Sequence, residues 1–177
     1  MSEEAPLYVE PILGWRTWQL DTDADGGSLP IGQFRPRAWI RGTDQAAVRE
    51  GSGQFRLVSG GATVWRPRER LTARCRAVRD HNAPDPGCMC GIYAARTHRI
   101  LRSMGYAAGP DDRDAPDLVG ELWLWGRMMV SDGVLRAEFA YPKRLVVPYL
   151  RWRWARPLEE TYGVPVEIRN PFTLEVD

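Results

Sequence analysis

The sequence predicts an α+β fold that is predominantly antiparallel β, with one amphipathic helix following a Cys/His metal site. Three observations support this class. Short alternating or β-branched segments are separated by glycines, one later stretch has apolar residues at helical spacing, and all three cysteines lie with a histidine in one 16-residue window. A chain of 177 residues fits one domain. We expect a single β-rich metal-binding domain over residues 7–156 and a C-terminal acidic extension over residues 157–177.

The first half of the chain predicts strands. Residues 14–20 alternate so that Trp15 and Thr17 face one side while Trp18 and Leu20 face the other. Other segments are β-branched or aromatic and are bounded by glycines or turn residues. The further strands are expected over residues 8–12, 34–41, 54–58, 62–65 and 72–78.

The second half predicts one main helix and one hairpin. A helix over residues 92–104 follows from apolar positions at helical spacing, with Gly105 as its stop. Residues 118–130 and 134–141 flank Ser131-Asp132-Gly133, a turn that tolerates positive φ and indicates a hairpin. Both faces of its first strand are apolar, which favours a central position in the sheet. A short helix over residues 157–162 and an extended segment over residues 164–168 complete the prediction.

Charge and targeting signals limit the possible partners and location. The net charge of +1 argues against a strongly polyanionic or polycationic partner. The start of the chain lacks the basic and apolar regions of a signal peptide, and no stretch reaches the roughly 18 apolar residues of a membrane span. We therefore expect a cytoplasmic protein without a membrane partner. Thiols persist in that reducing compartment, so an odd number of cysteines favours metal ligation over disulfides.

The spacing Cys-x5-His-x6-Cys-x-Cys predicts a metal site formed by Cys75, His81, Cys88 and Cys90. Three thiolates and one imidazole are the ligand set of tetrahedral zinc, and four protein ligands leave no position for a reacting water. We expect Zn2+ in a structural role, with Cys90 at the start of the helix. An iron-sulfur cluster is the alternative cofactor, and three buried cysteines acting as small apolar residues are the alternative without metal.

A basic aromatic segment over residues 143–156 indicates possible nucleic-acid binding. It interleaves cations with aromatic rings, as single-stranded nucleic-acid binders do. The same alternation describes a half-buried edge strand, so both interpretations stay open. The residues concerned are Arg144, Arg151, Trp152, Arg153 and Trp154.

The sequence resembles a family of small proteins from high-GC Gram-positive bacteria and their phages that has no assigned activity. The likeness centres on a Cys...His-x-x-Pro...Cys-x-Cys-Gly-Ile-Tyr-Ala motif and spans about residues 14–141. It supports a shared Cys/His site and adds no activity. The matching runs are Gly14–Trp18, Val64–Pro67, Ala73–Cys75, His81–Pro84, Cys88–Ala94, Leu124–Gly126 and Arg136–Ala140.

These patterns favour a zinc-stabilised binding or regulatory module that interacts with another protein. One alternative is an enzyme with a pocket near the helix and the 118–141 hairpin, in which Glu138, Arg136 or His98 converge in a polar cleft. The other is a nucleic-acid-binding protein that uses the basic aromatic segment. A protein-binding module should instead show an exposed apolar patch or a stable oligomer.

Overall fold

A computed structural model of the chain describes residues 10–22, 55–59, 63–75, 81–104 and 116–169. Within these ranges most elements are strands. No helix among the described residues has the length and apolar character needed to cross a bilayer. The strands are β1 Ile12–Thr22, β2 Phe55–Ser59, β3 Thr63–Trp65, β4 Leu71–Thr72, β5 Ile92–Ala95, β6 Leu118–Ser131, β7 Val134–Val147 and β8 Val166–Ile168. The helices are α2 His98–Ser103, the 3-10 helix η1 Tyr149–Trp154 and α3 Ala155–Tyr162.

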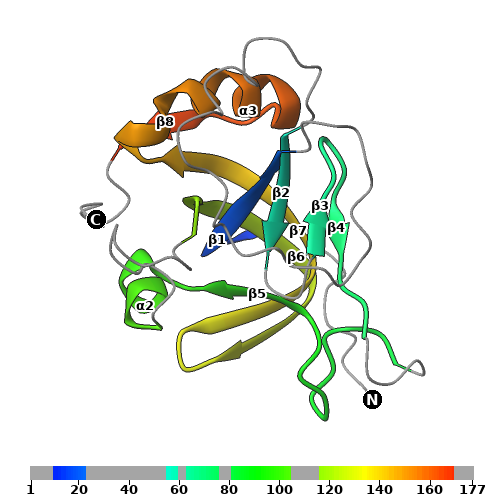
Figure 1. The fold of residues 1–177 in the computed structure, drawn as a ribbon. Coiled ribbons are helices and arrows are strands. Elements are labelled where there is room, and N and C mark those ends of the chain that lie inside the picture. Colours follow the sequence, from blue (N-terminus) through cyan, green and yellow to red (C-terminus); the bar gives the residue numbers. More distant parts are fainter. Residues whose placement is uncertain (1–9, 23–54, 60–62, 76–80, 105–115, 170–177) are drawn as a thin grey trace.

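Four strands close a ring of hydrogen-bonded pairs. β1 pairs with β6, β6 with β7, and β7 with β5, while β5 returns to β1 where Trp15 lies opposite Ala95. The long β6–β7 hairpin therefore curves around a small barrel (Figure 1). β2 and β3 extend the second half of β1 in an antiparallel arrangement. Closure leaves each of the four barrel strands with a partner on both sides.

The barrel interior is packed so closely that β1 needs a glycine there. A Cβ atom added at Gly14 would lie 2.8 Å from the Ala94 Cβ, 2.8 Å from Leu124 and 3.2 Å from Leu135. These three side chains come from β5, β6 and β7, and all are buried. The four strands of the ring therefore meet at one layer of side chains around position 14.

One edge of β7 pairs with β6, and the other edge pairs with three shorter strands in succession. β8 pairs with Leu145 to Val147, β4 pairs next, and β5 pairs with Val134 to Ala137. β4 and β5 run in the same direction, both antiparallel to β7. The Ala73 N–H donates to the Glu138 carbonyl, and Ile92 already lies opposite Ala137. The described residues 74–75 and 81–91 thus form a loop between two strands, β4 and β5, that follow one another along β7.

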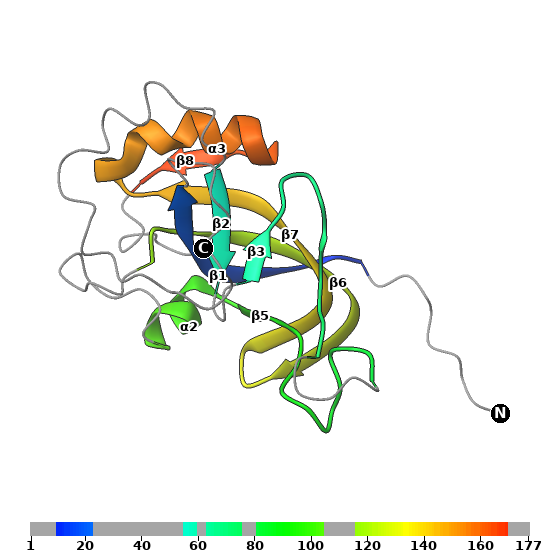
Figure 2. The ribbon, with the colours of Figure 1, turned by 45° about the vertical axis from the view of Figure 1, so that its right-hand side comes forward.

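α3 and β8 close the end of the molecule opposite this loop (Figures 1 and 2). Leu158, Tyr162 and Val164 belong to the main buried cluster together with residues of the barrel. The Tyr162 hydroxyl accepts from the Leu57 N–H at 2.7 Å and donates to the Trp65 carbonyl at 2.9 Å. The division into a domain over residues 7–156 and an extension over 157–177 stays a prediction, although α3 and β8 pack in the core.

The sequence predicted the hairpin well and part of the helix wrongly. Asp132 and Gly133 have positive φ at the turn, as expected, and β6 lies between β1 and β7. The helix expected over residues 92–104 begins only at His98, because residues 92–95 form β5. Their backbone pairs with β7, and this tertiary pairing overrides the helical spacing of the side chains. The helix therefore does not follow directly on the Cys/His segment.

Other predicted elements differ in extent. Among the described residues of the strand expected over residues 72–78, only Thr72 lies in a strand, as part of β4 at residues 71–72, and residues 76–80 lie outside the described part of the chain. The strand expected over residues 34–41 also lies outside it. The helix expected over residues 157–162 is the second part of α3, and Gly163 ends it in the left-handed conformation.

Replacing Tyr162 with Phe should destabilise the fold by about 2 kcal/mol, because it leaves the Leu57 N–H and the Trp65 carbonyl buried without a partner. Burial raises the pKa of Tyr162 to about 12, so the phenol keeps its proton at neutral pH. Urea unfolding measures the loss. Tyr149→Phe, on an exposed ring, is the matched control and should change the free energy of unfolding by a few tenths of a kcal/mol at most. Equal midpoints for the two variants would contradict the assigned role of the hydroxyl.

Candidate metal centre

The predicted metal ligands stand at both ends of the loop inserted between β4 and β5. Cys75 comes two residues after Ala73, the last residue that bonds to β7, and Cys90 comes two residues before β5 begins. His81 and Cys88 lie between them. The loop projects at the end of the molecule away from α3 (Figures 1 and 2). Because the two ends lie beside the same stretch of β7, the outer ligands are brought together by strand pairing.

The four side chains converge to metal-binding distances. The Sγ atoms of Cys75 and Cys88 are 3.6 Å apart, and the His81 Nε2 lies 3.3 Å from the Cys90 Sγ. One ligand atom from each of the four residues falls within 4.8 Å of all the others. Each residue is half-buried, and no disulfide links the three cysteines. The group that the spacing singled out is therefore one that could hold a metal ion.

Local interactions shape the loop around these ligands. The Cys88 N–H donates to the Asp85 carbonyl at 3.1 Å, which forms a turn before the Cys-x-Cys pair. Gly91 has a φ of +129°, and a Cβ there would lie 3.1 Å from Pro84 and 3.2 Å from the Arg136 Cβ. A side chain at position 91 would strain the backbone and crowd both neighbours. The glycine thus lets the chain turn from Cys90 into β5.

The residue between the two closely spaced cysteines points outward. Met89 is 80% exposed, and its carbonyl accepts a hydrogen bond from the Tyr93 hydroxyl at 2.5 Å. Its thioether is therefore a poor candidate for a fifth ligand.

A backbone hydrogen bond from Cys90 lowers the pKa of the Cys88 thiol, but the Cys75 side chain and desolvation outweigh it, so the pKa is raised.

The residues predicted to bind nucleic acid differ in their surroundings. Residues 149–154 form the 3-10 helix η1, and not an edge strand. Arg151 makes an ion pair with the buried Asp117 and stacks on Trp154. Arg144 lies in β7 and binds two carboxylates. Trp152 and Arg153 are exposed, with the Arg153 guanidinium 5.4 Å from the Trp152 ring.

Arg144 is the centre of an ion network that the sequence did not predict. Its guanidinium binds both carboxylate oxygens of Glu121, at 2.9 and 3.1 Å, and donates to Glu167 at 2.8 Å. Lys143 adds a contact to Glu121 at 3.3 Å. Burial by itself raises the pKa of Glu121, but the hydrogen bonds and charges of Arg144 and Lys143 outweigh it and lower the pKa. The network links β6, β7 and β8.

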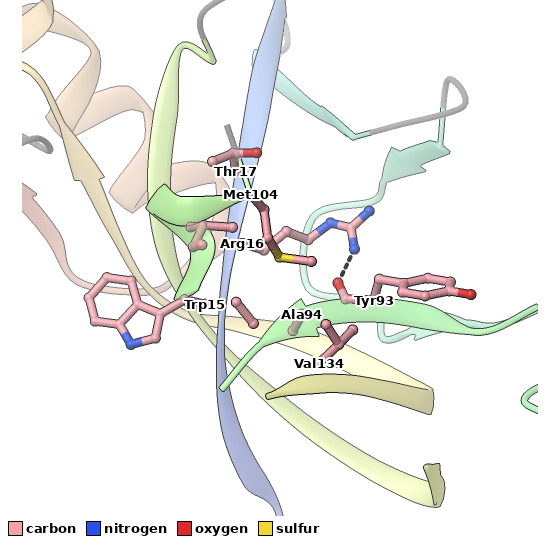
Figure 3. Close-up of a pocket in the computed structure, with 9 residues that line it drawn as sticks. Trp15, Arg16, Thr17, Tyr93, Ala94, Met104 and Val134 are labelled. Atoms are coloured by element: carbon pink, nitrogen blue, oxygen red, sulfur yellow. Dashed lines mark hydrogen bonds between the residues drawn. The ribbon is translucent and has the colours of Figure 1, made fainter. Parts of the chain in front are cut away.

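The residues named for an enzyme site lie outside the lining of the pocket beside α2. A small pocket of about 140 Å³ lies between α2, β1 and β5 and is lined mostly by apolar side chains (Figure 3). Its lining does not include Glu138, Arg136 or His98. Instead, His98 is buried against Trp15, and Glu138 accepts from the Arg127 N–H at 3.1 Å. Arg16 beside the pocket donates to the Tyr93 carbonyl and to Ser59.

Comparison with known proteins assigns no family to the chain. It matches no protein-family model, no curated protein and no solved structure. The resemblance to a family from high-GC Gram-positive bacteria and their phages therefore stays a prediction. The case for a function rests on the geometry of the chain itself.

Replacing Glu121 with Gln should lower the free energy of unfolding by about 2 kcal/mol at neutral pH, because hydrogen bonds to a charged partner are lost. The folded-state pKa of Glu121 lies below its usual 4.5, so the carboxylate contributes its stabilisation above that pH and loses it as the pH falls. The difference between the two proteins should therefore shrink below pH 4.5. Urea titrations across that range measure it, and Glu159→Gln, at an exposed carboxylate, is the control. A difference independent of pH would contradict the role of the charge.

Proposed function

We propose that the chain is a zinc-stabilised binding module that interacts with another protein. One observation supports the zinc centre, namely the distances between its donor atoms. A Zn–S bond of about 2.3 Å in a tetrahedral site puts two ligand atoms roughly 3.5 to 3.8 Å apart. The separations of 3.6 Å between Cys75 and Cys88 and 3.3 Å between His81 and Cys90 lie at this scale.

The same separations favour one ion over an iron-sulfur cluster. A cluster distributes its protein ligands over two or more iron atoms, so ligands on different irons lie further apart than the edge of one tetrahedron. All four donor atoms lie within 4.8 Å of one another. Three thiolates and one imidazole are also a ligand set that zinc prefers.

A structural role for the ion follows from its place in the fold. Four protein ligands complete a tetrahedral shell, which leaves no open position for a substrate or a reacting water. Cys75 and Cys90 stand where the chain leaves β7 and returns to it. An ion held there would close the neck of the loop and keep β4 and β5 in register on the same edge. Zinc–thiolate ligation also fits the cytoplasmic location that we propose, because the three free cysteines stay reduced in that compartment.

The purified chain should contain about one equivalent of zinc, and Cys75→Ser, Cys88→Ser and Cys90→Ser should each lose most of it. Each variant should also unfold at a lower temperature, because structural zinc contributes on the order of 10 kcal/mol of apparent binding energy. Elemental analysis and thermal unfolding measure the two effects. Met89→Ala is the control, since this exposed side chain lies between two ligands and should change neither quantity.

Three other outcomes would change or contradict the proposed metal centre. A coloured protein containing iron and inorganic sulfide would replace zinc with an iron-sulfur cluster. Metal loss without any change in unfolding would contradict the structural role. A purified chain that neither carries nor takes up metal would overturn the centre altogether.

The proposed protein-binding surface is the apolar side of η1. Leu150 is 93% exposed and Trp152 57% exposed, and Tyr149 beside them is also largely exposed. Three large apolar side chains within four residues are costly to leave in water, and such patches mark interaction sites. Aromatic residues with a neighbouring arginine are typical anchors of protein interfaces. Arg151 and Trp154, in contrast, are engaged with Asp117 and with each other, which leaves fewer groups for a nucleic acid.

Replacing Leu150 and Trp152 together with Ser should weaken partner binding at least tenfold without destabilising the fold, because both side chains lie in solvent. The measurement has two stages: quantitative affinity capture from the native host, followed by titration of the purified candidate partner. Val130→Ser is the matched control, an exposed apolar residue on β6 that lies outside η1. A candidate that binds the double variant as tightly as the natural chain would remove η1 from the proposed interface.

A further inference from the structure

Two arginines of the β6–β7 hairpin hold the backbone of the metal-binding loop. The Arg136 Nη1 donates to the Cys88 carbonyl and, at 3.3 Å, to the Cys90 carbonyl. The Arg127 Nη1 donates at 2.9 Å to the carbonyl of Asn82, the residue after His81. An arginine side chain is therefore bound to the carbonyl group of Cys88, to that of Cys90, and to that of the residue after His81.

The position of Arg136 is itself well defined by the sheet. Arg136 lies directly opposite Tyr93 of β5 and opposite Met129 of β6. Its Nη2 is 3.1 Å from the Met129 sulfur, and its guanidinium carbon is 5.9 Å from the centre of the Tyr93 ring. The side chain thus crosses the sheet surface between two neighbouring strands and ends at the Cys-x-Cys turn. These contacts within the sheet help to orient the guanidinium toward the turn.

This arrangement suits the chemistry of a zinc–thiolate centre. Three thiolates and one neutral imidazole around a divalent ion leave one net negative charge, which a nearby guanidinium stabilises. A terminal nitrogen of arginine carries two N–H groups, and here Nη1 donates to the carbonyls on both sides of Met89 while Nη2 contacts the Met129 sulfur. Groups that orient metal ligands in this way commonly control metal affinity.

We propose that Arg136 is a positioning residue of the metal centre, which fixes the Cys88–Cys90 turn so that both thiolates point at one ion. This inference rests on the proposed zinc centre. It makes metal affinity depend on a strand of the barrel, since the residue that organises the ligands belongs to β7. Arg127 gives the same kind of support at the His81 side of the loop.

The full-length chain with Arg136→Met should bind zinc 10- to 100-fold more weakly, the loss usual when a group that orients metal ligands is removed. Competition with a chromophoric chelator measures the affinity. The Co2+-substituted variant should also show altered visible absorption, because the two thiolates are no longer held in place. Arg153→Met removes the same charge at an exposed site outside the loop and should bind zinc like the natural chain.

Arg136→Lys tests the geometry of the guanidinium at constant charge and keeps the test valid if Arg136→Met does not fold. Lysine retains the charge and most of the stem but has one terminal nitrogen in place of two, so it cannot contact both carbonyls and the Met129 sulfur in the same planar arrangement and should recover only part of the lost affinity. Natural affinity and an unchanged cobalt spectrum in Arg136→Lys would overturn the positioning role while leaving the zinc centre intact. A natural chain that binds no zinc would instead overturn the proposed centre on which the inference rests.

Discussion

The structure depends on the edge of β7 that β4 and β5 share. These two strands pair with it one after the other, although they are separated in the chain. β4 and β5 occupy adjacent positions on that edge, yet residues 74–91 lie between them in the chain. Closing such a loop costs conformational entropy, and β4 contributes only two paired residues to offset it. The candidate ligands lie at the two ends of this loop. A metal ion that joins them there would offset the entropy cost of closing the loop. The barrel needs β5 in register, because β5 joins β7 to β1.

β7 also organises the surfaces around the barrel. Near one end Arg136 reaches the Cys-x-Cys turn, and near the other Arg144 holds Glu121 and Glu167 across three strands. Beyond β7 the chain enters η1, where apolar side chains lie in solvent while Arg151 is anchored on Asp117. The proposed metal centre and the proposed protein-binding surface thus lie beside opposite ends of the same strand. A metal ion that stabilises β7 would therefore stabilise the strand next to which both sites lie.

Local signals predicted the elements whose shape is decided locally. The Asp132-Gly133 turn was predicted because it requires positive φ, and Gly163 ends α3 for the same reason. The helix was predicted too early because Ile92 and Ala94 are buried by β7 and not by a helical neighbour. The 3-10 helix η1 was missed because its alternating residues imitate an edge strand. For residues 92–95, a partner distant in the chain overrides the local pattern.

The sequence by itself determined the candidate ligand set, since thiolates and imidazoles clustered within a short Pro-rich and Gly-rich loop need no distant partner to indicate a metal. It also determined the strand-rich class and the hairpin. Only the tertiary structure decided that Cys75 and Cys90 stand at the neck of a loop, and that Arg136 and Arg127 hold it. Those arginines lie 36 or more residues beyond the loop in the chain. Such contacts arise from strand register, which spacing within the loop does not encode.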